Sequence, residues 1–314
     1  MAGIFADSKT FVDMKLKMSP EQIWLNFEQL MRKYSDNPPR NAVEHFVHNN
    51  FDEAGSEFVN WDPVDWHENP KFLSNITDPN LKDWARELHS YWKQLGRKIK
   101  EDVSLQPNLY SMIYVPNPVI VPGGRFREFY YWDSYWIIDG LLLSQMEHTV
   151  KGMLENFMYM VNTLGYIPNG GRVYFQRSQP PLLIPMVKLY ADKTNDLDFV
   201  RKNLATLMAE FDFWMKNRTV TVTHGDKEYL LARYNVEKGA PRPESYREDY
   251  ELAHQLKTEE EKDELYVNLK SAAESGWDFS SRWYLPPSGF KGKLLEYYCP
   301  FSIMISFMGV TGAI

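Results

Sequence analysis

The sequence predicts an all-α protein in which paired helices are joined by long loops and accompanied by one small β-hairpin. Apolar residues recur at steps of three and four over several long stretches, the spacing that places them on one face of an α-helix. Pro- and Gly-rich loops separate these stretches, and a single segment has the alternation typical of strands. The 314 residues suffice for two ordinary domains or one large one.

The first predicted helix begins after Ser19, in "SPEQIWLNFEQLMRKYS". Ser19 and Gln22 have the spacing of a capping box, and Pro20 suits the first helical position. Residues 37–80 are rich in Trp and Phe, and we expect them to form an ordered but irregular wrap. A long helix is then predicted over 78–102. Its apolar stripe comprises Leu81, Trp84, Leu88, Trp92 and Leu95.

The remaining helices are predicted from the same periodicity, and the hairpin from its turn. Two β-branched or aromatic runs flank Gly225-Asp226 in "VTVTHGDKEYLLARY", which favours a hairpin. Long loops on a helical scaffold usually carry the function, so the loops are where we expect the site. The further helices are predicted over 133–145, 147–164, 180–192, 196–217 and 258–274.

Composition excludes several classes of function. The net charge of −7 and the pI near 5.6 argue against a nucleic-acid partner, because such proteins usually carry a basic stripe. Cys299 is the single cysteine, so no internal disulfide forms, and no Cys/His spacing is typical of zinc. His45 and His48 lie three residues apart without a matching carboxylate pattern, which favours a helix-face role over a metal site. We therefore expect no metal.

One stretch mixes aromatic rings and charges unusually closely. In "PGGRFREFYYWDSYW", residues 122–136, seven rings lie among two arginines, a glutamate and an aspartate behind a Pro-Gly-Gly turn. A core helix would separate rings and charges onto two faces. Interleaved, they suit a surface that stacks on a flat ligand and hydrogen-bonds its rim, as sugars and nucleobases require. The acidic net charge disfavours the nucleobases.

This stretch resembles the first signature of the trehalases, glycoside hydrolases that split α,α-trehalose into two glucose molecules. Further segments resemble the family's other motifs in order and spacing: "DSKTFVDMKLK", "IPNGGRVYFQRSQPPLL", "APRPESYREDY" and "AAESGWDFSSRW". The resemblance covers roughly residues 5–290 and is to the animal type. It implies part of an (α/α)6 toroid and an inverting mechanism that uses no metal and no cofactor.

The resemblance implies that Asp278, in "SGWDFSS", is the general acid. Trp277 and Phe279 beside it would lower the local dielectric and raise the pKa of the carboxyl, as a proton donor near neutral pH requires. The alternative interpretation is that Asp278 only caps the turn that follows it.

The resemblance also implies a set of substrate-binding residues. The arginines among them suit sugar hydroxyls, although a single arginine is more often a structural ion-pair partner. Trp132 would offer a ring face to a pyranose, with core packing as the alternative. Gly276 would let the backbone approach the sugar. The set is Arg125, Trp132, Asp133, Asn169, Arg177, Ser178, Gln179, Arg242, Pro243, Glu244 and Gly276.

The family's general base is a glutamate near a Gln-Trp-Asp motif, and this sequence has no such motif. We therefore interpret residues 1–298 as the N-terminal part of a catalytic domain, incomplete at both ends, and residues 299–314 as a divergent apolar tail. The tail is shorter than a membrane span needs, about 20 apolar residues. The first residues show no signal peptide, whereas the resemblance implies an extracellular or membrane-associated protein.

Two expectations follow from the missing motif. The chain as given should not hydrolyse trehalose, so an inactive sugar-binding protein or a non-functional splice product is the alternative to an active trehalase. Half a toroid should also leave apolar stripes exposed, such as those around Leu141–Leu143 and Met153–Met160.

Overall fold

The protein is mostly helical, which confirms the predicted fold class, and the computed structural model describes residues 2–278 and 280. The predicted tail, residues 299–314, lies outside the described residues. The α-helices are α1 (Lys9–Val12), α2 (Pro20–Lys33), α3 (Arg40–Asn50), α4 (Pro79–Leu95), α5 (Asp102–Leu105), α6 (Ser134–Leu143), α7 (Glu147–Leu164), α8 (Leu183–Thr194), α9 (Leu197–Asn217), α10 (Tyr246–Ala253) and α11 (Glu259–Glu274). Short 3-10 helices are η1 (Lys71–Asn75), η2 (Pro107–Leu109) and η3 (Pro243–Ser245).

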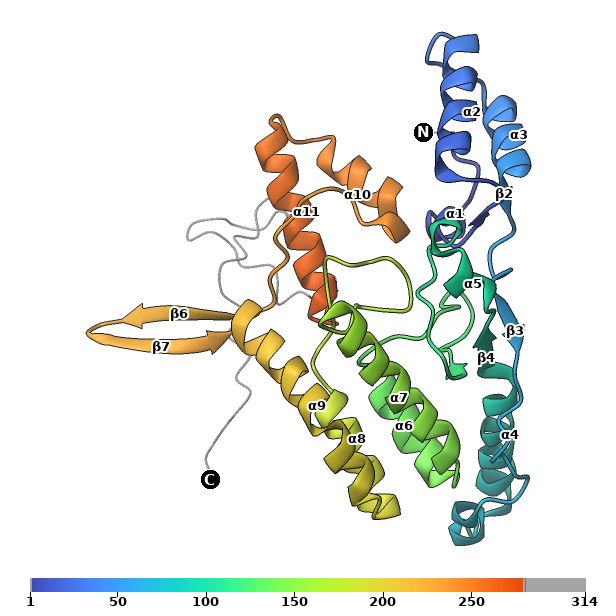
Figure 1. The fold of residues 1–314 in the computed structure, drawn as a ribbon, viewed down its shortest axis with the longest axis vertical. Coiled ribbons are helices and arrows are strands. Elements are labelled where there is room, and N and C mark those ends of the chain that lie inside the picture. Colours follow the sequence, from blue (N-terminus) through green and yellow to red (C-terminus); the bar gives the residue numbers. More distant parts are fainter. Residues whose placement is uncertain (1, 279, 281–314) are drawn as a thin grey trace.

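The strands form three small antiparallel sheets. The predicted hairpin is confirmed: β6 and β7 pair around Gly225, whose φ of 62° suits a tight turn, and the hairpin projects from the body (Figure 1). The other sheets pair β1 with β2 and place β4 between β3 and β5. Their bounds are β1 (Lys15–Leu16), β2 (Phe51–Asp52), β3 (Phe58–Asn60), β4 (Gly96–Ile99), β5 (Val119–Ile120), β6 (Thr219–His224) and β7 (Lys227–Ala232).

The core of the described chain centres on α6 and α7. Helix α6 packs on α8, and α7 packs on α8, α9 and β5. The expectation that the stripes around Leu141–Leu143 and Met153–Met160 are exposed is wrong for most of their residues. Leu141, Met153 and Met160 are buried, because α6 packs on α7 and α8 while α8, α9 and β5 cover α7. Leu143 and Tyr159 are exposed. An exposed apolar stripe lies instead on α9, at Leu204, Met208, Phe211 and Met215.

Helix α2 begins where the sequence predicts, but with half of the expected cap. The hydroxyl of Ser19 accepts a hydrogen bond from Gln22 N at 3.3 Å, and Pro20 is the first helical residue. The Gln22 side chain donates instead to Asn26 Oδ1 at 3.0 Å, so the reciprocal capping box is a wrong prediction. A full capping box occurs at α11, between Thr258 and Glu261.

The predicted helix over 78–102 is too long. Helix α4 ends at Leu95, and Gly96–Ile99 forms β4 because β3 and β5 flank it and satisfy its backbone groups. Gly96 suits this site, since a Cβ there would lie 2.1 Å from Trp61 O. Much of the predicted apolar stripe of α4 is exposed: Leu81, Trp84 and Leu88.

Residues 37–80 are more regular than predicted. They contain α3 and η1 as well as β2 and β3. Helix α3 lies beside α2 (Figure 1), and Asn26 Nδ2 donates to Asn50 Oδ1 at 2.7 Å across the pair. This tertiary contact stabilises α3. The local apolar periodicity of α3 is weak, so the sequence alone did not predict the helix.

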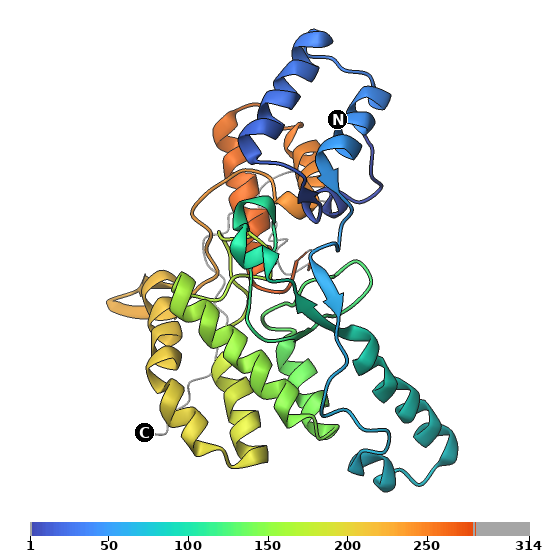
Figure 2. The ribbon, with the colours of Figure 1, turned by 45° about the vertical axis from the view of Figure 1, so that its right-hand side comes forward.

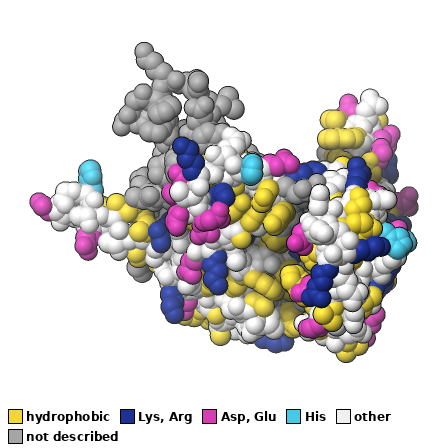
Figure 3. Space-filling model, turned by 90° about the horizontal axis from the view of Figure 1, so that it is seen from above, with side chains coloured by type: hydrophobic (Ala, Val, Ile, Leu, Met, Phe, Trp, Pro, Cys, Tyr) yellow, Lys and Arg dark blue, Asp and Glu magenta, His cyan; other side chains and the backbone are white. Residues whose placement is uncertain are grey.

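Segments far apart in the sequence meet near the end of α11: the loop before α6, the loop between α7 and α8, and η3 (Figure 2). On the face seen in Figure 3, basic side chains are interspersed with acidic ones. None of the described helices is long and apolar enough to cross a membrane.

Candidate active site

A pocket of about 400 Å³ opens where these segments meet. The structure brings together in its lining every residue of the predicted site except Ser178 and Pro243. Pro243 begins η3 and so places Glu244, while Ser178 is fully buried behind the lining. The lining comprises Pro122, Arg125, Phe126, Tyr130, Trp132, Asp133, Asn169, Arg177, Gln179, Arg242, Glu244, Ser245, Ala273, Gly276 and Asp278.

Two walls of the pocket are joined by backbone hydrogen bonds. Tyr131 N donates to Asn169 O at 3.2 Å, and Gly171 N donates to Phe129 O at 2.9 Å. Gly171 allows this approach, because a Cβ there would lie 2.6 Å from the Phe129 ring. Gln179 Oε1 also accepts a hydrogen bond from Trp132 N at 3.1 Å. The two aromatic and Gly-rich motifs therefore form one continuous surface.

Each of the three predicted arginines has a carboxylate partner. Arg242 makes a bidentate pair with Asp249 at 2.8 and 2.9 Å, and both side chains are buried. Arg177 Nη2 pairs with Glu244 Oε1. Arg125 pairs with a residue near the N-terminus, described below. The interpretation of these arginines as ion-pair partners is therefore correct, and the same three side chains line the pocket.

Three buried polar atoms in the pocket residues have no hydrogen-bond partner among the described residues. They are Asp133 Oδ2, Arg177 Nε and Glu244 Oε2. Asp133 stands at the N-cap of α6, yet its side chain makes no capping bond there, and its carboxyl interacts instead with Gln179. Buried polar groups without partners are rare in folded proteins. Their position around one pocket suits a ligand rich in hydroxyl groups.

Asp278 follows α11 and lies exposed on the pocket surface. Desolvation by the surrounding protein raises the pKa of its carboxyl, and the nearby Arg242 and Arg177 only partly oppose this effect. Of the predicted apolar flanks, Trp277 is itself exposed, and Phe279 lies outside the described residues. The carboxyl thus has the protonation tendency of an acid catalyst.

Glu274, one turn before Asp278, links four segments behind the pocket. It is fully buried and accepts a hydrogen bond from Ser178 N at 2.8 Å and another from Asn235 N at 3.0 Å. Arg218, at the end of α9, pairs with both of its oxygens. Sequence reasoning missed this residue, although it belongs to the motif "AAESGW". An acidic residue inside the apolar face of a helix was the available signal.

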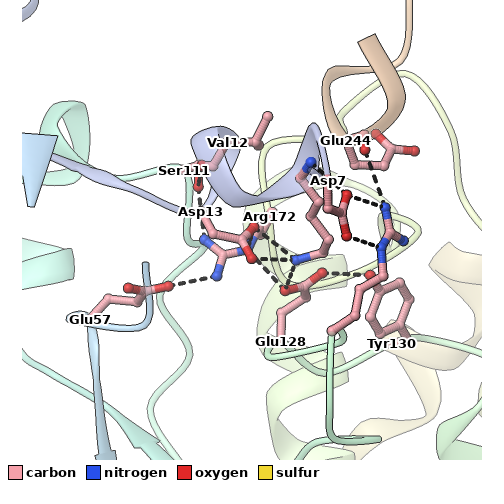
Figure 4. A network of polar contacts seen from close by, with 11 residues as sticks. Asp7, Val12, Asp13, Glu57, Ser111, Glu128, Tyr130, Arg172 and Glu244 are labelled. Carbon is pink, nitrogen blue, oxygen red and sulfur yellow. Dashed lines mark hydrogen bonds and ion pairs between the residues drawn. The ribbon is translucent and has the colours of Figure 1, made fainter. Parts of the chain in front are cut away.

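A buried ion cluster supports the pocket from the other side (Figure 4). It consists of Lys9, Asp13, Glu57, Glu128 and Arg172, all almost fully buried. Arg172 Nε lies 2.9 Å from both Asp13 Oδ1 and Glu128 Oε2, and its Nη2 lies 2.6 Å from Glu57 Oε1. Lys9 Nζ lies 2.6 Å from Asp13 Oδ2 and 2.9 Å from Glu128 Oε2.

The cluster reaches the pocket through an aromatic residue. Tyr130, a pocket residue that sequence reasoning did not single out, donates its hydroxyl to Glu128 Oε1 at 2.5 Å. Burial would raise the pKa of Glu128, but Arg172 and Lys9 hold it below its usual range. The ionised carboxylate of Glu128 therefore orients the pocket wall.

Gly276 packs too closely against Trp132 to leave room for a side chain. Its φ is 71°, and a Cβ would lie 2.5 Å from the Trp132 ring. Gly276→Ala should displace this ring and raise the Kd for trehalose, the ligand that the resemblance predicts, by roughly 5-fold, the equivalent of one lost aromatic contact. Isothermal titration calorimetry measures this Kd.

Gly225→Ala is the matched control, because its φ is 62° but nothing lies within 4 Å of the added Cβ. It should introduce the same backbone strain without changing the Kd. Equal affinities for the wild type and Gly276→Ala would show that the Trp132 ring does not contact the sugar.

The chain is similar to proteins of one family over most of its length. The family model described as "Trehalase" matches residues 3–306. A trehalase of Apis mellifera is 56% identical over 94% of this chain and 47% of its own length, and one of Homo sapiens is 52% identical over 91% and 49%. A solved structure, neutral trehalase Nth1 from Saccharomyces cerevisiae, is 27% identical over 52% of this chain and 34% of its own, with a TM-score of 0.43. The chain spans about half the length of the curated relatives. It belongs to the trehalase family.

Proposed function

We propose that this chain supplies the glucose pocket and the general acid of an α,α-trehalase, which hydrolyses trehalose to two glucose molecules with inversion. The observation that carries the proposal is the set of unpartnered polar atoms at Asp133, Arg177 and Glu244 around the same pocket as Asp278. A pyranose has the ring face and the hydroxyl rim that these side chains and Trp132 would bind. The volume of about 400 Å³ lies in the usual range for small-molecule sites.

In this proposal Asp278 protonates the glycosidic oxygen as the bond to the anomeric carbon breaks. Its raised pKa favours the protonated form of the carboxyl, which is the form that donates. Arg177 and Arg242 lie close enough to influence this carboxyl, and they would stabilise the carboxylate that remains after proton transfer.

Inversion also needs a carboxylate base on the opposite face of the sugar, at about 6.5–9.5 Å from the acid. Two other carboxylates line the pocket, but Glu244 is paired with Arg177, and Asp133 interacts with Gln179. We assign both to sugar hydroxyls. The base is assigned to the region of the relatives that this chain does not match, where the family has its Gln-Trp-Asp motif.

The test compares two polypeptides with trehalose. Residues 1–314 should bind trehalose in calorimetry and release no glucose. A chimera in which residues 1–280 precede the C-terminal half of the Apis mellifera relative should release two glucose molecules per trehalose. Glucose release by residues 1–314 alone would show that a carboxylate of this chain is the base. Failure of both polypeptides to bind trehalose would show that the pocket has another ligand.

A further inference from the structure

The N-terminal segment, residues 5–13, reaches a residue of the pocket directly. Asp7 Oδ2 accepts a hydrogen bond from Arg125 Nε at 2.5 Å, and Asp7 Oδ1 accepts one from Arg125 Nη2 at 2.9 Å. Arg125 Nη2 also donates to Glu244 O at 3.4 Å. The guanidinium therefore contacts both the N-terminal segment and η3, whose residues Asp7 and Glu244 are labelled in Figure 4. None of the residues assigned to the site above lies in this segment.

Asp7 is held in place by the residue two positions further along the chain. Lys9 N donates to Asp7 Oδ1 at 3.0 Å, and the Lys9 side chain enters the buried ion cluster, where it is 1% exposed. Withdrawing the ammonium would leave Asp13 and Glu128 in the protein interior with one cation fewer. Detaching the segment would therefore cost much free energy. Lys9, which anchors it, lies two residues from Asp7.

The N-terminal segment also contacts residues that follow Arg242 in the chain. Ser8 Oγ donates to Glu248 Oε2 at 3.0 Å, and Arg247 Nη2 donates to Ala6 O at 2.7 Å. Helix α1 contacts η3, which carries Glu244. These contacts bridge about 240 residues of sequence and fix Asp7 relative to both sides of the pocket.

We propose that Asp7 is a positioning residue of the sugar pocket, which acts by fixing the guanidinium of Arg125 before the sugar arrives. The inference rests on the proposed function, because it takes the ligand of the pocket to be trehalose. A long, flexible arginine side chain that is ordered only on binding lowers the affinity, whereas one already ordered does not. Asp7 is suited to this, since its hydrogen bond to Arg125 lowers its pKa and keeps it ionised.

The test measures the Kd of trehalose for residues 1–314 by calorimetry. Asp7→Asn keeps an oxygen for Lys9 N but loses the charge, and should raise the Kd by about 5-fold. Asp7→Glu should restore most of the affinity. Both side chains of the pair are half-exposed, so the midpoint of thermal unfolding should not change. Asp83→Asn, which breaks the exposed pair of Asp83 and Arg86 on α4, is the control and should change neither quantity.

A double-mutant cycle separates this role from a general effect of the charge. In the background Arg125→Met, Asp7→Asn should have no further effect on the Kd. Additive effects, or a wild-type Kd for Asp7→Asn, would overturn the inference and leave the proposed function intact. Absence of trehalose binding by the wild type would overturn the proposed function and the inference together.

Discussion

Asp278→Asn should lower the rate of trehalose hydrolysis by at least about 10²-fold, the usual contribution of a general acid. An amide of nearly the same shape cannot donate the proton that the leaving oxygen needs. The Kd for trehalose should change little, because the carboxyl is exposed on the pocket and the substitution preserves its volume. The measurement is the steady-state kcat of the chimera with the C-terminal half of the Apis mellifera relative.

The pH profile provides a second readout for the same residue. An acid catalyst acts in its protonated form, so kcat/KM of the unsubstituted chimera should fall as the pH rises through the raised pKa of Asp278. Asp278→Asn should lose this alkaline limb, whereas Asp83→Asn on the surface of α4 should keep both the limb and the rate. If Asp278→Asn retains more than about a tenth of the turnover, another group is the acid.

Arg172→Met should destabilise the fold by about 3–5 kcal/mol, the usual cost of removing one partner from a buried ion pair. The substitution leaves Asp13, Glu57 and Glu128 buried with Lys9 as their remaining cation in the cluster. Chemical unfolding of residues 1–314 measures the loss. Arg201→Met is the matched control, since Arg201 pairs with Asp198 at the surface, and it should cost no more than about 1 kcal/mol.

The loss at Arg172 should depend on pH in a defined direction. Arg172 and Lys9 lower the folded-state pKa of Glu128, so this carboxyl contributes stability above its unfolded pKa and loses it as the pH falls through the folded value. Without Arg172, only Lys9 and Tyr130 oppose the desolvation of Glu128, so this contribution to stability shrinks. The difference between variant and wild type should therefore be largest near neutral pH and shrink in the acidic range. A difference that stays constant with pH would mean that lost packing, and not charge, is the cause.

Much of the lining of the candidate pocket could be predicted from the sequence, but the electrostatics of the pocket could not. Short motifs identified Asp278, Trp132 and Arg177, because the family resemblance assigns a role to each residue type at its place in the motif. No motif indicates that Asp133, a typical N-cap residue, makes no side-chain capping bond to its helix and has one carboxylate oxygen without a partner among the described residues. That outcome depends on Gln179, which lies 46 positions further along the chain.

By itself the sequence determined the helices with strong periodicity: α7, α9 and α11 begin and end within one residue of their predicted bounds, and the hairpin has its predicted turn. Local periodicity suffices there because one apolar face and a good cap act within a few residues. Tertiary structure alone decided that α4 ends at Leu95, since the partners of β4 come from residues 58–60 and 119–120. Tertiary structure also decided that Lys9 forms a buried ion pair with Glu128, which lies 119 positions further along the chain. The strength of such a contact depends on burial, and burial exists only once the whole chain has packed.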